Sequence, residues 1–388
     1  ILTHLTKGMS GVKKLKHDDL YSKYIDAGVF GTVDYSLEHD FSRRDRKTMG
    51  PVSYYACQVA KEALEMADPG EGFITSGRMG VAFGSTHGSP IVQRNLYQAL
   101  FDDTHEGYSS IKAVDYLKFM VHTTAVNITK MFGITGRVIS SSTACTTSSQ
   151  SIGFGYEMIK YGMQDAMLCG GADEYDMSTV AVFDNLMACS TDYNDTPHLT
   201  PRPFDRDRDG LVVGEGAGAV LLESYESARK RDADILAEVI GFSCNNNGGD
   251  LILPNRSGIT QTIKLGLRDA AINPDAVDFI SAHATATKHG DAIEAQATGS
   301  VYGKSPVVCG LKSYTGHTMG SCGVIESIMT IYMMQEGFIA PTLNLDNVDE
   351  QCAMIQHARE IIETDIRIAA IQNFAFGGVN TCLILKKP

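Results

Sequence analysis

Short runs of apolar residues alternate along the chain with segments of helical periodicity, and Gly and Pro separate them. Apolar runs bounded by turn-forming residues are typical of buried strands, whereas apolar residues repeating every three to four positions indicate helices. We therefore predict strands at residues 79–84, 137–142, 165–170, 211–222, 236–242, 277–282, 307–311, 368–374 and 381–386. We predict helices at residues 116–131, 148–161, 259–271, 291–302 and 323–335. This alternation predicts an α/β protein with mixed, largely buried sheets.

The chain also contains a weak internal repeat. Residues 137–162 and 307–337 each run from a strand through a turn of small residues into a helix that stops at Gly. In both segments reactive side chains lie where the strand leads into the helix. Two similar α/β halves explain the repeat, and we expect them at residues 1–240 and 241–388.

The composition is that of a folded, acidic protein. Of the 388 residues, 43% are hydrophobic and 20% are charged, which excludes a disordered chain. The 33 basic and 46 acidic residues give a net charge of −13, which argues against nucleic acid and anionic membrane as general partners. No apolar stretch is long enough to predict a transmembrane helix.

The number and spacing of the cysteines indicate the redox environment of the protein and exclude some kinds of site. The nine cysteines form no CxxC pair, and none has a histidine at metal-ligand spacing. This pattern predicts a reducing, cytoplasmic location with mostly buried thiols, and argues against disulfides and a zinc site. The chain has no P-loop and no HExxH motif, and the Gly214–Gly218 run lacks the spacing of a dinucleotide fingerprint.

One cysteine lies in a segment suited to chemistry. Cys145 follows a predicted strand, precedes a predicted helix and is surrounded by Ser, Thr and Ala. The N–H groups and dipole of a helix N-terminus stabilise a thiolate, so we expect a lowered pKa and a nucleophilic sulfur at Cys145. A buried structural cysteine in a Ser/Thr-rich turn is the alternative.

Two histidines and a lysine follow later strands. His283 ends a predicted strand, where α/β proteins place catalytic groups, and His289 and Asp291 nearby raise the idea of a metal site, which their offsets disfavour. Lys312 and His317 share the next such turn. A buried lysine needs an anionic partner, and Glu326 is the nearest candidate in that segment. The alternatives are a structural histidine, a solvated lysine and a capping histidine.

A fourth segment contains paired glycines after an aromatic residue. In Asn373–Asn380, Gly377 and Gly378 follow Phe376, which predicts a turn whose N–H groups could face an oxyanion.

Taken in order, these segments resemble the β-ketoacyl-[acyl-carrier-protein] synthase family, elongating type, of the thiolase superfamily. The resemblance runs from residue 5 to 388, and its motifs are Thr143-Ala-Cys145, Pro203-Phe-Asp205, Arg208-Asp-Gly-x-Val-x-Gly-Glu-Gly-Ala-Gly218, His283-x-Thr-x-Thr-x-x-x-Asp291, Lys312-Ser-x-Thr-Gly-His317 and Asn373-Phe-x-Phe-Gly-Gly-x-Asn380. It implies a thiolase-like fold of two similar α/β halves in α-β-α-β-α layers. It also implies an acyltransferase that elongates fatty acids by decarboxylative condensation of malonyl carrier protein with a bound acyl chain.

The resemblance assigns the central roles. Cys145 would carry the acyl chain, and the backbone N–H groups of Cys145 and Phe376 would form the oxyanion hole. His283 and His317 would bind the malonyl thioester carbonyl and stabilise the enolate. Phe376 would also gate the acyl pocket, and Phe183 would form part of its wall.

The remaining assignments concern charge and substrate arms. Lys312 would pair with Glu326 and tune the histidines, while Thr285 and Thr287 would hold the phosphopantetheine arm. No metal and no other cofactor is expected, because the carrier protein brings the substrates. The basic residues expected to dock this acidic partner are Arg43, Arg44, Arg46 and Lys47, with a solvated helix start as the alternative.

The sequence departs from the family pattern in three places. Ala284 and Ala286 replace the Gly and Ser that are common in the His283 motif, and Cys322 replaces Ala. The family's first strand is expected upstream of Ile1.

Two alternatives within the family stay open. One is a ketosynthase of a specialised type II polyketide or aryl-polyene pathway. The other is a non-catalytic subunit resembling a chain-length factor, which the presence of Cys145 disfavours. We expect a homodimer, with a heterodimer as the alternative.

Overall fold

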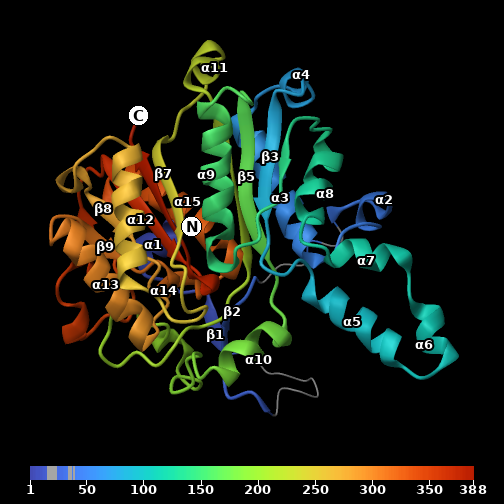
Figure 1. The fold of residues 1–388 in the computed structure, drawn as a ribbon, viewed down its shortest axis with the longest axis horizontal. Coiled ribbons are helices and arrows are strands. Elements are labelled where there is room, and N and C mark those ends of the chain that lie inside the picture. The colour runs from blue at the N-terminus through green and yellow to red at the C-terminus, as the bar shows by residue number, and fades with distance from the viewer. Residues whose placement is uncertain (15–23, 34–36, 38–39) are drawn as a thin grey trace.

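Two large sheets organise the computed structural model, which describes residues 1–14, 24–33, 37 and 40–388 (Figure 1). The first sheet has the order β4 (Val138–Ile139), β3 (Met79–Gly84), β5 (Ala166–Asp173) and β6 (Gly216–Glu223). The second has the order β11 (Gln356–His357), β9 (Val307–Cys309), β8 (Phe279–Ser281), β13 (Ile368–Phe374), β14 (Val379–Lys386) and β7 (Glu238–Asn246). Neighbouring strands run parallel except for β6, β14 and β7, which pair antiparallel with their neighbours.

Helices cover both outer faces of the sheets and fill the space between them. α3 (Pro51–Ala67) and α8 (Thr123–Phe132) lie on the first sheet, and α12 (Arg256–Asp269) and α13 (Lys288–Tyr302) on the second. α9 (Thr147–Lys160) and α15 (Cys322–Glu336) lie between the sheets. The predicted α-β-α-β-α layering is confirmed.

Small residues let α9 sit close to both sheets. A Cβ on Gly153 would come 2.2 Å from the Phe242 ring on β7, and a Cβ on Gly155 would come 2.2 Å from Cys169 Sγ on β5. Both contacts are shorter than van der Waals distance, so these positions need glycine. The close fit fixes α9, and with it the turn that precedes its first residue.

The other elements are shorter or lie at the edge of the layers, and α5 to α7 extend away from the body (Figure 1). They are α1 (Leu2–Lys7), β1 (Val12–Lys14), β2 (Val29–Gly31), α2 (Arg43–Arg46), α4 (Glu71–Ile74), α5 (Pro90–Phe101), α6 (His105–Ser110), α7 (Ala113–Phe119), α10 (Met177–Asn185), α11 (Tyr225–Lys230), α14 (Lys312–Thr315), β10 (Phe338–Ile339) and β12 (Ile362–Glu363). Within the described ranges, every helix is too short or too polar to cross a bilayer.

Several predicted elements differ from the structure, and the strand predicted at 137–142 is reduced to the two residues of β4. The helix predicted at residues 116–131 is wrong as one element, because α7 ends at Phe119 and α8 begins at Thr123. The chain turns there against Gly88, where a Cβ would come 2.0 Å from the Phe119 carbonyl oxygen. The strand predicted at 211–222 is only partly confirmed, since β6 begins at Gly216 and the preceding residues form isolated bridges instead.

Candidate active site

Cys145 lies in a single turn of 3-10 helix, η3 (Ala144–Thr146), directly before α9. The turn places Ala144 in the left-handed region, with φ of 49°. The thiol is buried, with 8% of the residue exposed, and the backbone N–H groups of Cys145 and Phe376 lie close enough to act on its pKa. The two N–H groups predicted for an oxyanion hole therefore converge on this sulfur.

The expected low pKa of Cys145 is wrong for this resting state. Burial raises the pKa of the thiol to about 11, although Lys312 and the two backbone N–H groups act in the opposite direction. The free-energy cost of removing the thiolate from water is larger here than the stabilisation that Lys312 and the N–H groups provide. The sulfur is therefore a neutral thiol at pH 7, and its reaction needs a base.

His317 supplies a nitrogen at the right place. Its Nε2 lies 3.0 Å from Cys145 Sγ. Its backbone is fixed by two hydrogen bonds to the segment before β6, from His317 N to Val212 O at 2.7 Å and from Gly214 N to His317 O at 2.9 Å. The residues that break the predicted long strand thus hold the histidine in position.

His283 faces the same space from the end of β8. Its ring centroid lies 5.3 Å from that of His317, with the rings nearly perpendicular. Burial, reinforced by the positive charge of Lys312, holds the pKa of both histidines well below the usual value. Both are therefore neutral at physiological pH, and neutral imidazoles can donate hydrogen bonds without supplying a second proton.

Lys312 connects His283 to a buried polar network. Its ammonium group forms an ion pair with Glu326 on α15 and lies 3.2 Å from His283 Nδ1. An ammonium group can only donate, so Nδ1 accepts and the neutral ring carries its proton on Nε2. The predicted pairing of Lys312 with Glu326 is confirmed.

The network extends to two residues whose roles the sequence did not reveal. Asn373 on β13 donates from Nδ2 to Glu326 Oε2 at 2.7 Å, and its Oδ1 accepts from Ser149 Oγ. Asn373 lies in a recognised motif, whereas Ser149 is one of many small polar residues after Cys145 and carries no signal of its own. The network ties the start of α9 to the lysine.

The loop after β8 presents Thr285 and Thr287, whose hydroxyl oxygens lie 3.1 Å apart and half-buried. Glu294 on α13 accepts from the N–H groups of His283 at 2.8 Å and Ala284 at 2.7 Å. Sequence reasoning missed Glu294, because it lies eleven residues from His283 on a separate element.

Asp291 belongs to the same support, which argues against the metal role first considered for it. Its carboxylate accepts from Ala286 N at 3.1 Å and Phe204 N at 2.8 Å, and it is fully buried, whereas His289 is exposed. Those backbone contacts occupy the oxygens that a metal would need.

Among the described residues, the closest set of potential metal ligands is Cys145, His283 and His317, whose ligand atoms lie within 4.8 Å of one another. The buried Lys312 ammonium group lies next to His283, so a divalent ion here would meet an existing positive charge. This spacing therefore suits one shared substrate oxygen better than a cation.

Two aromatic rings pack against each other next to the site, one of them on Phe376. Phe183 on α10 and Phe376 have ring centroids 5.7 Å apart, and Phe376 is 38% exposed, whereas Phe183 is buried. Phe376 is followed by Gly377 and Gly378, both with positive φ, which lets the backbone turn sharply after the ring. This arrangement is compatible with the predicted gate and wall.

The predicted docking residues lie on a different part of the surface. Arg43, Arg44 and Arg46 form the short α2, and Lys47 follows. α2 lies beside α8 (Figure 1), where Lys130 forms an ion pair with Asp45 at 3.8 Å. Arg43, Arg44 and Lys47 are exposed.

Comparison with known proteins agrees with this geometry. The family model "Beta-ketoacyl synthase, N-terminal domain" matches residues 2–228, and "Beta-ketoacyl synthase, C-terminal domain" matches residues 236–346. The chain is 32% identical to 3-oxoacyl-[acyl-carrier-protein] synthase 1 of Escherichia coli (strain K12) over 397 residues, which covers 100% of this chain and 94% of that protein.

Solved structures show the same likeness. A beta-ketoacyl synthase from Burkholderia phymatum STM815 superposes with a TM-score of 0.95 and 41% identity, covering 100% of this chain and 95% of that one. The AntDE:AntF complex, a type II PKS acyl-carrier protein with its ketosynthase bound to the hexaketide, gives a TM-score of 0.88 and 26% identity, covering 100% and 94%.

Proposed function

Because the chain belongs to the β-ketoacyl synthase family, we propose that it acts as a 3-oxoacyl-[acyl-carrier-protein] synthase with Cys145 as its nucleophile. The observation that carries this proposal is the convergence of Cys145 Sγ, His317 Nε2 at 3.0 Å and two backbone N–H groups in one buried site. Residues 1–240 would supply the nucleophile, and residues 241–388 would supply the two histidines.

The first half-reaction loads the acyl chain. Cys145 Sγ attacks the carbonyl carbon of an acyl thioester on the carrier's phosphopantetheine, and the N–H groups of Cys145 and Phe376 stabilise the oxyanion. The thiol proton passes through His317 Nε2 to the departing pantetheine sulfur. The new thioester leaves both histidines neutral.

The second half-reaction forms the carbon–carbon bond. Before the second half-reaction the neutral His317 ring moves its proton from Nδ1, which has no hydrogen-bond partner among the described residues, to Nε2. The malonyl thioester oxygen then accepts hydrogen bonds from His283 Nε2–H and His317 Nε2–H, which stabilise the enolate as CO₂ leaves. The enolate carbon then attacks the acyl carbonyl on Cys145, and the oxyanion forms again at the two N–H groups. Collapse releases the 3-oxoacyl product and the Cys145 thiolate, which takes up a proton.

The partner is acyl carrier protein, and we propose that Arg43, Arg44, Arg46 and Lys47 dock it while Thr285 and Thr287 hold its phosphopantetheine arm. Arg43, Arg44 and Lys47 of this cluster are exposed on an otherwise acidic chain, which favours an acidic partner at this place. The paired threonine hydroxyls beside His283 offer hydrogen bonds to the amides of the arm.

Reversing the charge of the exposed pair tests this docking role. We expect the double variant Arg43→Glu/Arg44→Glu to raise KM for malonyl carrier protein roughly tenfold, because the steering charges are lost. The acylation of Cys145 by a small synthetic thioester should not change. Arg367→Glu, an exposed charge change on the other half, is the control, and an equal rise in KM for that variant would contradict a specific site.

We also propose that two copies associate. Large side chains are exposed along the protruding helices α5 to α7, among them Phe101 at 84%, Tyr108 at 75% and Tyr116 at 57%. Such a face is typical of a surface covered by a second subunit. Light scattering should therefore give about twice the 42.0 kDa mass of one chain, and the monomer mass at micromolar concentration would contradict the proposal.

A reconstituted assay tests the activity itself. The substrates are malonyl carrier protein and a carrier protein loaded with an acyl chain. We expect release of CO₂, formation of 3-oxoacyl carrier protein and an acyl group on Cys145 that mass spectrometry detects. Release of CO₂ without condensation, or an acyl group on another residue, would contradict the assignment.

A role in a type II polyketide pathway is the second candidate, favoured by the similarity to the ketosynthase of the AntDE:AntF complex over the whole chain. The same assay separates the two. Saturated acyl chains accepted in preference to polyketide or polyene chains support fatty-acid elongation.

A further inference from the structure

Arg208 is among the largest fully buried side chains of the described protein, with 1% of it exposed, although it lies outside the catalytic motifs. Its guanidinium group makes contacts in three directions. Nη1 donates to Asp205 O at 2.8 Å and to Asp349 Oδ2 at 2.7 Å, Nη2 donates to Lys288 O at 2.7 Å, and Nε donates to Thr287 O at 3.2 Å. A planar fork can serve all these acceptors at once, which an ammonium group cannot.

The segment that Arg208 reaches is unusual in its backbone. Ala284 has φ of 34° and Ala286 has φ of 66°, both in the left-handed region that disfavours residues with a Cβ. Residues held in this way persist only when their surroundings determine the conformation. The segment also carries His283, Thr285 and Thr287.

Buried charged side chains supply those surroundings. Glu294 accepts from the N–H groups of His283 and Ala284, and Asp291 accepts from that of Ala286. Arg208 donates hydrogen bonds to the carbonyl oxygens of Thr287 and Lys288 at the other end of the segment. Its Nε also lies 3.7 Å from Asp291 Oδ2. The strained loop is thus held by carboxylates at its N–H groups and by one guanidinium at its carbonyls.

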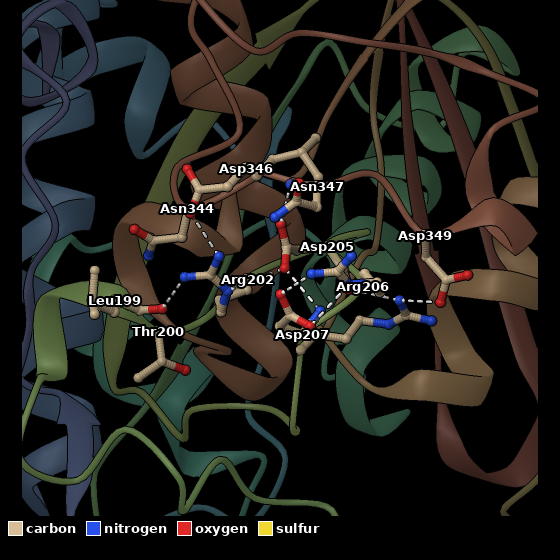
Figure 2. A network of polar contacts seen from close by, with 12 residues as sticks. Leu199, Thr200, Arg202, Asp205, Arg206, Asp207, Asn344, Asp346, Asn347 and Asp349 are labelled. Carbon is tan, nitrogen blue, oxygen red and sulfur yellow. Dashed lines mark hydrogen bonds and ion pairs between the residues drawn. The ribbon is translucent and has the colours of Figure 1, made fainter.

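A second buried arginine in the same polar network provides a comparison (Figure 2). Arg202 donates to Leu199 O at 3.2 Å and forms ion pairs with Asp205 at 3.3 Å and Asp346 at 2.7 Å. In Figure 2, Asp205 lies between Asn347 and Asp207, and its carboxylate accepts hydrogen bonds from the backbone N–H groups of both. These contacts of Arg202 connect the 199–205 turn to Asp346 and do not involve the loop after β8.

We propose that Arg208 is a positioning residue for the substrate loop, holding residues 284–288 in the strained conformation that aims His283, Thr285 and Thr287 at the malonyl carrier arm. The proposal rests on the proposed function for its substrate, but the geometric role can be measured without activity. Its consequence is that Arg208 governs use of the malonyl carrier, while the resting Cys145 thiol, held by η3 and His317, does not depend on it.

The test compares Arg208→Lys with Arg202→Lys. The second variant is the matched control, because it makes the same substitution at an arginine that is nearly as buried. Hydrogen exchange followed by mass spectrometry should show faster exchange of the 284–288 amides, on the order of tenfold, in Arg208→Lys but not in Arg202→Lys. KM for malonyl carrier protein should rise several-fold in Arg208→Lys alone. The rate of Cys145 alkylation by iodoacetamide should stay the same in both variants.

A milder variant guards against misfolding. Asp349→Asn removes the carboxylate charge that pairs with Arg208 Nη1 but keeps an oxygen that accepts from Gln351 N. Amide exchange at 284–288 and KM for malonyl carrier protein should both rise, by a smaller factor than in Arg208→Lys. Unchanged exchange at 284–288 in folded Arg208→Lys or Asp349→Asn, or an equal change in Arg202→Lys, overturns the positioning role. If the variants show the expected differences in exchange but the wild-type protein forms no 3-oxoacyl product, the proposed function fails and the positioning role stands.

Discussion

Replacing Cys145 by Ala should abolish condensation, with a fall in 3-oxoacyl product on the order of 10⁴-fold or more, as for removal of a catalytic nucleophile. The side chain is small and lies in a turn held by its own backbone hydrogen bonds, so the fold should survive the change. The two histidines and Lys312 are untouched. Decarboxylation of malonyl carrier protein should therefore continue at a measurable rate while product formation stops, which carbon dioxide release and product analysis will separate.

Cys322 is the matched control for this experiment. It is an equally buried thiol whose Sγ donates to the Cys145 carbonyl oxygen at 3.2 Å, and its pKa lies well above the usual value because of burial. Cys322→Ala should change condensation by only a few-fold. Product formed by Cys145→Ala at more than one per cent of the wild-type rate would show that another group carries the acyl chain.

Much of the fold could be predicted from the sequence because its strands are buried on both faces. Every residue of β3 and of β5 is buried, so each appears as a run of apolar or small residues, apart from Asp173 at the end of β5. The predicted strand at 79–84 is confirmed residue for residue. The pairing of Lys312 with Glu326 could be predicted for a similar reason. A buried lysine must have an anion nearby, and α15 offers one within its first two turns.

The rest depends on contacts between segments distant in sequence. His317 owes its position to Val212 and Gly214, about a hundred residues earlier, and no local pattern predicts that pairing. The pKa of Cys145 was predicted with the wrong sign, because the sequence shows the helix N-terminus but not the depth of burial. Glu294 was missed because its donors are backbone N–H groups, which every residue possesses. Arg208 was noticed only as part of a motif, because its acceptors at Thr287, Lys288 and Asp349 lie 79 to 141 residues away.

Replacing Lys312 by Met should damage both stability and catalysis. Glu326 would lose its ion-pair partner while remaining 2% exposed, and breaking a buried pair in this way costs about 3–5 kcal/mol of unfolding free energy. Burial already raises the pKa of Glu326, and loss of Lys312 raises it further. A carboxyl group whose folded pKa lies above its unfolded value destabilises the fold as pH rises through that folded pKa. Denaturation of Lys312→Met should therefore show a larger deficit against wild type at pH 8 than at pH 5.

A second substitution separates the two effects. Lys312→Met/Glu326→Gln removes the unpaired charge and leaves an amide that still accepts from Asn373 Nδ2, so most of the lost stability should return. Decarboxylation should remain depressed by roughly 10²–10³-fold, because His283 Nδ1 still lacks the donor that keeps the ring proton on Nε2. If activity returned together with stability, Lys312 would serve only to neutralise Glu326. Recovery of stability alone would show that the lysine acts on the reaction through the tautomer of His283.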